Sequence, residues 1–164
     1  MTTTETDALN LGLTSSQTED VLALLAAILA DTHVLYIKTR NYHWNVTGPD
    51  FQQLHSLFET QYTQLEAEID GVAERIRSLG GQAPGTMAEY LRLASLREEP
   101  GRAPAATAML RAVLADHEAL VRSLRDGVDR AAERCHDAGT ADFLTGLMEA
   151  HEKTAWMLRA HLPA

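Results

Sequence analysis

Four long stretches of this chain carry apolar residues at the spacing of one helix face, and breaks rich in Gly and Pro separate the stretches. Residues three and four apart lie on the same side of a helix, so this period predicts amphipathic helices. No stretch of useful length shows the alternation of a strand. Amphipathic helices bury their apolar sides against one another, and we therefore expect an all-α four-helix bundle. The predicted helices cover about 16–44, 50–79, 104–135 and 140–161.

The segment before the first helix sets the expected domain boundary. Residues 1–15 are polar, rich in Thr and without periodicity, so we expect a flexible N-terminal tail in front of a bundle domain of residues 16–164. The first helix is expected to begin with Ser15 or Ser16 as its N-cap, because Glu19 follows Ser16 at the spacing of a capping box.

The connection between the second and third predicted helices is long for a bundle. It takes about 24 residues, where a simple up-and-down bundle needs only a short turn. It also contains a short amphipathic helix of its own, 86–96. A long crossover is a feature of ferritin-like bundles. The connection therefore favours a ferritin-like four-helix bundle with a short extra helix in the crossover between helices two and three.

Charge and composition restrict the partners and the compartment. The formal net charge is -9, from 23 acidic against 14 basic residues, which repels nucleic acid phosphates and anionic lipids and attracts cations. Cys135 is the single cysteine, so no intrachain disulfide can form. The N-terminus lacks the basic and apolar parts of a signal peptide. The longest apolar run, Val21–Ala30, is ten residues, too short to span a bilayer. These features predict a soluble, cytoplasmic protein that does not bind membranes.

Histidines and carboxylates gather on and around the second predicted helix. His55 and Glu59 are four residues apart, and so are Asp70 and Glu74, so each pair projects to one side of the helix. His43 lies at the end of the first helix, where the following turn can fold it back toward His55. Imidazole and carboxylate together form a ligand set that suits iron, zinc or manganese.

The distance between the two pairs predicts a site that two subunits share. Glu59 and Asp70 are eleven residues apart, which is about 16 Å along a helix, whereas metal–ligand bonds are only about 2 Å long. One helix therefore offers two half-sites. Glu59 with Asp70, and His55 with Glu74, have the same midpoint at 64–65. A two-fold axis there would bring the first pair of one subunit opposite the second pair of its partner.

A purely structural interpretation of these residues stands beside the metal site. A helical His, Asp or Glu next to an apolar stripe is commonly solvated or salt-bridged. Glu66 lies on the same stripe, and Arg75 and Arg77 are near enough to Glu74 to form ion pairs. The spacing alone leaves both interpretations open.

A long motif surrounds the candidate ligands: NYHWNVTGPDF at 41–51, LH at 54–55, LFE at 57–59, ID at 69–70, AERI at 73–76 and LGG at 79–81. It closely resembles the signature of the Dps family, the DNA-binding proteins from starved cells. The resemblance covers essentially the whole chain. It implies a ferritin-like subunit, paired in two-fold dimers that assemble into a hollow dodecamer with tetrahedral symmetry.

The resemblance also implies a site and a reaction. Ferroxidase centres at the two-fold interfaces would oxidise Fe(II) with hydrogen peroxide, and more slowly with dioxygen, and the ferric product would be stored as a mineral inside the shell. The same ligand set would also admit zinc as a competitor of iron. Trp44 matches a family Trp beside the centre, with a core anchor at the helix end as the alternative. The implied metal ligands and catalytic residues are His43, His55 and Glu59 from one subunit and Asp70 and Glu74 from its partner.

Two further positions follow from the resemblance. Glu59 stands where the family usually has Asp, which keeps the carboxylate but moves it by roughly one bond length, and we still expect a working site. Asp142 and Glu149 on the fourth helix are expected to line a three-fold entry pore. Their alternative is an exposed helix surface, with Asp142 favoured near the helix N-terminus.

A metal centre inside one subunit is rejected. Ferritin-like di-iron bundles use Glu-x-x-His pairs that point into the core. The single match here, Glu133 to His136, falls at the predicted end of the third helix, where a His is expected for electrostatic reasons. His117 and His151 lie on apolar stripes and are expected to be core histidines with a hydrogen-bond partner.

The alternative function is a DNA-binding, nucleoid-condensing protein with weak ferroxidase activity. Binding to phosphates needs clustered cations. Residues 1–20 contain no Lys or Arg, so direct DNA binding is expected to be weak or absent despite the family name. A plain helical interaction module without metal chemistry would explain the periodicity but neither the common midpoint nor the motif.

Overall fold

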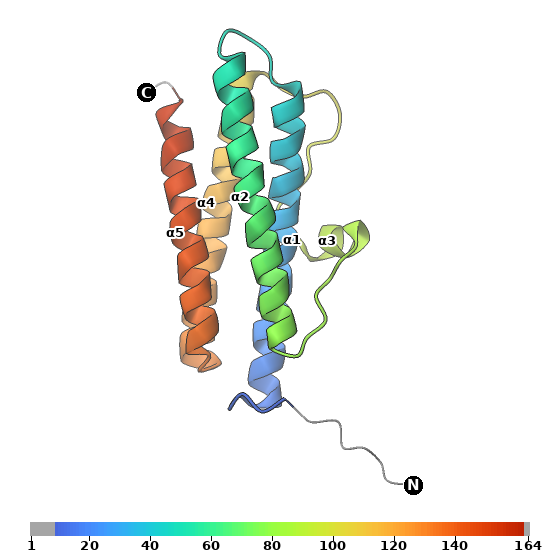
Figure 1. Cartoon of the computed structure of the whole chain (residues 1–164), viewed down its shortest axis with the longest axis vertical. Helices are drawn as coiled ribbons and strands as arrows, with labels where there is room; N and C mark the ends of the chain where they lie inside the picture. Colours follow the sequence, from blue (N-terminus) through green and yellow to red (C-terminus); the bar gives the residue numbers. More distant parts are fainter. Residues whose placement is uncertain (1–8, 163–164) are drawn as a thin grey trace.

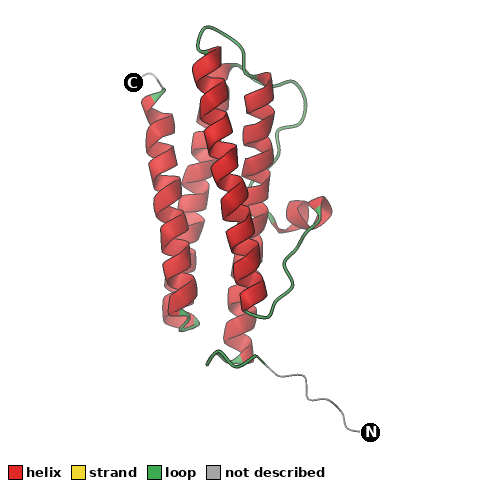
Figure 2. Ribbon diagram, in the orientation of Figure 1, coloured by secondary structure: helices red, strands yellow, loops and turns green. Residues whose placement is uncertain are grey.

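The structure, a computed structural model, describes residues 9–162. This part of the chain is helical and contains no strand, which confirms the all-α class (Figure 2). Residues 1–8 of the expected tail, and residues 163–164, lie outside the described residues. The elements are α1 (Ser15–Asn45), α2 (Phe51–Ser78), α3 (Met87–Leu93), α4 (Ala106–Asp129), the one-turn π-helix η1 (Arg130–Arg134) and α5 (Ala138–Ala160).

The four long helices lie side by side along the bundle (Figure 1). α1 packs mainly on α2, and α4 packs mainly on α5. The ion pairs of Lys38 with Asp116 and of Asp20 with Arg130 show that α1 and α4 run antiparallel. The crossover from α2 to α4 carries α3 and returns along α1 (Figure 1). The ferritin-like bundle with a short extra helix in a long crossover is therefore confirmed.

Apolar stripes from all four long helices meet in one core. Their spacing of three to four residues along each helix is the reason that one face of each can be buried. Gly81, just after α2, lets the side chain of Leu22 pack directly on its backbone, because a Cβ there would lie 2.5 Å from Cδ2 of Leu22. Fully buried core residues include Val21, Leu25, Leu35, Phe58, Val72, Val113, Leu124, Leu144 and Leu158.

The N-cap of α1 differs from the prediction. Thr14 caps the helix, not Ser15 or Ser16: its hydroxyl accepts from the backbone N–H of Gln17, whose side chain accepts from the Thr14 N–H. A capping box takes Gln as well as Glu at its third position, so Thr14 and Gln17 satisfy the pattern two residues before the predicted pair.

The short helix α3 is also shorter than predicted. Thr86 is its N-cap, in a capping box with Glu89, rather than its first residue. At the other end, the backbone N–H groups of Ser95 and Leu96 donate to the buried carboxylate of Asp31 on α1, at 2.6 and 2.8 Å. These donors are therefore lost to the helix, which ends at Leu93.

The third predicted helix is divided. α4 ends at Asp129 and continues as the π-helical turn η1 up to Arg134. His136 then adopts a left-handed backbone with φ 54°, which reverses the chain. Asp137 caps α5 by accepting from the backbone N–H of Thr140. Arg75 of α2 donates to the same carboxylate at 3.1 Å, so this corner ties α2 to α5.

Among the described residues, one helix, α1, is long and apolar enough to cross a membrane by length and composition alone. Its most apolar 18 residues have a mean hydropathy of 1.7, and half of that window is buried in the fold. Buried polar groups on α1 also bond to other elements, Asp31 to the crossover and Lys38 to Asp116 of α4 at 2.5 Å. α1 thus packs as a core helix of the bundle.

Candidate metal centre

His43 and His55 face each other across the turn that joins α1 to α2. His43 is buried in the last turn of α1, and His55 is half-buried near the start of α2. Their rings stack, with 3.8 Å between the centroids and 21° between the planes. Nδ1 of each ring lies 2.8 Å from the backbone carbonyl oxygen of the other residue. The fold therefore brings these two candidate ligands together.

The reciprocal hydrogen bonds determine which nitrogen of each ring carries the hydrogen. A carbonyl oxygen only accepts, so both Nδ1 atoms must donate. In a neutral imidazole the lone pair then resides on Nε2. Metal-binding histidines are commonly oriented in this way, by a hydrogen bond from the second ring nitrogen. The bond from His55 also satisfies the carbonyl of His43, one of those that the C-terminal end of α1 leaves unpaired.

The three candidate carboxylates lie on α2, and all three are exposed. Glu59 is one turn from His55, whereas Asp70 and Glu74 are on later turns of the same helix. Within residues 9–162, no three His, Cys, Asp or Glu side chains are grouped so that they could hold one ion. A single chain thus presents two imidazoles at one place and carboxylates on an open face of α2.

Asp70 lines a groove of about 530 Å³ between α2 and its neighbours. Glu66 of α2, His33 of α1 and Tyr90 of α3 line the same groove. The rings of His33 and Tyr90 are stacked at 3.7 Å, and burial lowers the pKa of His33 against a weaker opposing effect of its bond to the Leu29 carbonyl. The groove runs along the middle of α2, where the predicted two-fold axis would lie.

The nearby basic side chains have other partners than the candidate ligands. Arg75 pairs with Asp137 at 3.1 Å, and Arg77 donates to the carbonyl of Gly81 at 2.5 Å. In the described part of the chain, no side-chain ion pair joins Glu59, Asp70 or Glu74 to a base. An ion-pairing role within one subunit therefore does not account for these carboxylates.

Arg40 and three aromatic rings form a cluster beside His43 that the sequence interpretation missed. The Arg40 guanidinium lies 5.4, 5.2 and 5.2 Å from the ring centroids of Tyr36, Trp44 and Tyr62. The Tyr62 ring meets the His43 ring edge-on at 5.2 Å. The spacing of four residues from Tyr36 to Arg40 and on to Trp44 was a usable signal, because such residues stack on one helix face.

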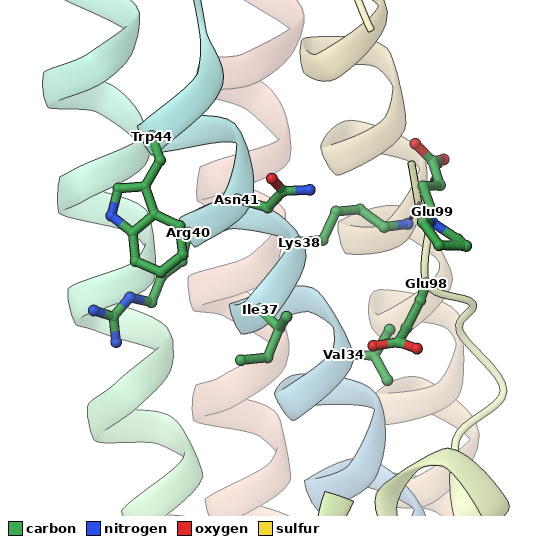
Figure 3. Close-up of a pocket in the computed structure, with 9 residues that line it drawn as sticks. Val34, Ile37, Lys38, Arg40, Asn41, Trp44, Glu98 and Glu99 are labelled. Carbon is green, nitrogen blue, oxygen red and sulfur yellow. Dashed lines mark ion pairs between the residues drawn. The ribbon is translucent and has the colours of Figure 1, made fainter. Parts of the chain in front are cut away.

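Trp44 is not a core anchor within the subunit. It is 65% exposed at the end of α1, which makes that alternative wrong. Its side chain lines a pocket of about 330 Å³ between α1 and the segment after α3 (Figure 3). Lys38 reaches toward Glu99 in this pocket, at 3.9 Å. Burial, with a hydrogen bond donated to Glu99, raises the pKa of the Tyr42 hydroxyl beside it.

The remaining candidates lie elsewhere. Asp142 and Glu149 are exposed on α5, away from the pair of histidines. His136 is exposed and Glu133 lies in η1. His117 and His151 are buried and contact each other through their Nδ1 atoms at 2.7 Å, as expected for core histidines with a hydrogen-bond partner.

Comparison with known proteins gives a consistent result. The model of the Ferritin-like domain family matches residues 22–163. The chain is 51% identical over 154 residues to a low temperature-induced protein of Nostoc sp., covering 94% of this chain and 86% of the relative. It is 40% identical over 144 residues to DNA protection during starvation protein 2 of Bacillus anthracis, covering 88% and 97%.

Solved structures show the same likeness. Dps from Bacillus brevis superposes with a TM-score of 0.87 at 39% identity, covering 92% of this chain and 100% of that one. Dps from Vibrio cholerae O1, described as a member of a superfamily of ferritin-like diiron-carboxylate proteins, gives a TM-score of 0.89 at 32% identity, covering 95% and 98%. The chain therefore belongs to the ferritin-like domain family and, within it, to the Dps proteins.

Proposed function

We propose that this protein is a ferroxidase that stores iron, and that its dinuclear centres form between two subunits. Membership of the Dps proteins and the ferritin-like fold support iron storage and DNA protection in general. The observation that carries the finer proposal is the pair of His43 and His55, each with its hydrogen held on Nδ1 by a carbonyl 2.8 Å away. Both rings are thereby prepared to coordinate through Nε2.

The carboxylates needed to complete such a centre would come from a second subunit. Glu59 can join the two histidines from its own chain, since it is one turn from His55. Asp70 and Glu74 are about three and four turns further along α2, too far to reach the same ion. Their exposure on an open face of α2 leaves them accessible to a partner. A two-fold axis at 64–65 would place them opposite the histidines of that partner.

Fe(II) is the substrate of the proposed reaction, and hydrogen peroxide is the preferred oxidant. Peroxide takes up two electrons, and two Fe(II) ions held side by side supply one each, so the O–O bond is cleaved without releasing hydroxyl radical. Two Fe(II), one peroxide and two waters give two FeO(OH) and four protons. The mixed N/O ligand set suits iron and also admits zinc, which we expect to compete.

The proposed assembly is a hollow dodecamer built from these two-fold dimers, in the cytoplasm. The net charge of -9 favours entry of Fe(II) and nucleation of the ferric mineral. Asp142 and Glu149, both exposed, are available to line an entry pore. We assign DNA protection to removal of iron and peroxide rather than to direct binding, because a strongly acidic surface repels phosphates. A gel shift at low salt with clear retardation of DNA would contradict that assignment.

The test is an anaerobic Fe(II) titration followed by one equivalent of peroxide. Wild type should bind Fe(II) saturably and oxidise it rapidly, while Asp70→Asn should lose at least about tenfold in affinity. Asp129→Asn, a matched change of an exposed carboxylate at the end of α4, should behave as wild type. A wild-type protein that neither binds Fe(II) nor oxidises it above the buffer rate would refute the proposal.

A further inference from the structure

A buried polar cluster, formed by Glu68 of α2, His117 of α4 and His151 of α5, lies inside the bundle and is not used by the proposed centre. Both histidines are 2% exposed. Their Nδ1 atoms are 2.7 Å apart. On the other side of its ring, Nε2 of His151 lies 3.3 Å from Oε2 of Glu68. The core polar cluster thus forms a continuous series of contacts across three helices.

The geometry of the core polar cluster suits a shared hydrogen rather than a metal ion. Glu68 and His117 contact opposite nitrogens of the His151 ring, so the three donors do not converge on one point, in agreement with the absence of such a group in residues 9–162. Two Nδ1 atoms at hydrogen-bond distance instead need one hydrogen between them, with one nitrogen donating and the other accepting.

The carboxylate determines which nitrogen donates. The negative charge of Glu68 favours a hydrogen on Nε2 of His151, although the contact of 3.3 Å is an ion-pair distance and not a well-aligned hydrogen bond. A neutral His151 then presents the lone pair of Nδ1 to the Nδ1–H of His117. Nε2 of His117 is buried without a hydrogen-bond partner. A proton added there would create an unpaired, charged donor in the core.

The surroundings offer nothing to stabilise a charged His117. Burial first, and the neighbouring His151 second, hold the pKa of His117 well below its ordinary value. Glu68 is the charged group from α2, and it is separated from His117 by the His151 ring. Three pairs of charged groups on the packed helices bind each other: Lys38 with Asp116, Arg125 with Glu152, and Arg159 with Glu118. Within residues 9–162, no charged or titratable side chain forms an ion pair or a hydrogen bond with His117 except the His151 ring.

We propose that the core polar cluster is a proton-sensitive contact: it joins α2, α4 and α5 while His117 is neutral, and it is destabilised when His117 becomes protonated, because the new N–H then lies buried without a partner at Nε2. Protonation of His151 as well would set two N–H groups against each other at the 2.7 Å contact. Acid would therefore loosen the packing of α5 on α2 and α4 from within the subunit, independently of any change at a subunit interface.

The sign of the pH dependence follows from linkage. In the unfolded chain His117 titrates near the ordinary histidine value of about 6.5, whereas in the folded chain it stays neutral to lower pH. Unfolding therefore takes up this proton below about pH 6.5. As the pH falls further below this value, the unfolding constant rises by about tenfold for each pH unit and each such histidine. His33, whose pKa burial also lowers, acts in the same direction.

His117→Asn tests the proposal, because the Asn amide can replace the Nδ1–H donor and does not titrate. Chemical unfolding of the assembled protein is measured at one protein concentration between pH 7.5 and 5.5. Over this whole range we expect the unfolding constant of wild type to rise by about tenfold more than that of the variant, because His117 goes from mostly neutral to mostly protonated in the unfolded chain. His161→Asn, a change at an exposed position after α5, should retain the wild-type dependence. Equal pH dependence in all three proteins overturns the proposal.

A second measurement covers the case in which His117→Asn does not fold. Proton uptake on unfolding is measured by calorimetry at pH 5.5, in buffers of different ionisation enthalpy, for wild type and His33→Asn. Wild type should take up more protons per subunit than the variant, and the variant should still take up about one, which is the proton of His117. A variant that takes up none excludes His117 as the remaining group. Neither experiment involves iron, so the result is independent of the proposed ferroxidase function.

Discussion

Replacing Asp31 should detach the crossover from α1, and the structure indicates how much stability this costs. The buried carboxylate accepts from the Ser95 N–H at 2.6 Å, from the Ser95 hydroxyl at 2.8 Å and from the Leu96 N–H at 2.8 Å. A hydrogen bond to a charged group contributes about 1.5–3 kcal/mol. Ser95 is exposed, so water can restore part of the loss. For Asp31→Ala we expect a destabilisation of about 2–4 kcal/mol.

Asp31→Asn separates the charge from the geometry. Both backbone N–H groups donate to the single oxygen Oδ1, which the Asn carbonyl can replace. The Asn amide can donate to the Ser95 hydroxyl where the carboxylate accepted from it. All three contacts therefore survive, and the expected cost falls to about 1 kcal/mol.

Thermal unfolding at one protein concentration measures the global effect, and hydrogen exchange of the Ser95 and Leu96 amides measures the local one. Asp31→Ala should speed exchange at these two amides far more than Asp31→Asn does. The reasoning is refuted if Asp31→Ala costs less than about 0.5 kcal/mol, or if the two variants are equally unstable.

Three further outcomes are expected. Gly81→Ala would place a methyl 2.5 Å from the Leu22 side chain and should lower the stability in thermal unfolding by about 1–3 kcal/mol. Adding Leu22→Ala should recover part of this loss, and purely additive losses would contradict this account. Burial acts to raise the pKa of Asp137, but hydrogen bonds from Thr140 outweigh it and lower the pKa. The ionised Asp137 carboxylate therefore stabilises the folded chain at neutral pH, and this contribution is lost in acid. Asp137→Asn should therefore unfold more easily than wild type at pH 7 and approach it near pH 3, and a constant difference in urea unfolding would be the contrary result. His55→Asn keeps a donor for the His43 carbonyl but lacks Nε2, so calorimetry should find a folded protein, within about 1 kcal/mol of wild type, that no longer binds Fe(II) saturably.

The helices were predictable because their signal is local. Apolar periodicity and Gly-Pro breaks lie within each segment, so the bundle, its long crossover and the extra helix followed from the sequence. The approach of His43 to His55 was also predictable, since a short turn joins their helices. The ends of α3 were not, because Asp31 and Ser95 are 64 positions apart and only the folded chain brings them together.

The sequence proposes the ligands of the candidate centre, but it could not predict how the fold supports the two histidines. Residue spacing predicts two half-sites on α2 with a common midpoint, and these stay a prediction. The exchange of hydrogen bonds between the two histidines depends on how the α1–α2 turn positions both backbones. The exposure of Trp44 at the end of α1 likewise depends on how the helices pack. Such features arise from tertiary packing and cannot be predicted from residue spacing.

Complementation between His55→Asn and Asp70→Asn tests the intersubunit centre most directly. In a dimer of one variant with the other, one site carries both substitutions and the second site carries neither. Random pairing after co-expression should restore about one quarter of the wild-type sites, because half of the dimers are mixed and each holds one intact site. Fe(II) stoichiometry and peroxide-dependent oxidation should recover to that extent, although each variant alone is inactive. If the mixture remains as inactive as its parents while forming mixed dimers, the centre does not form between subunits.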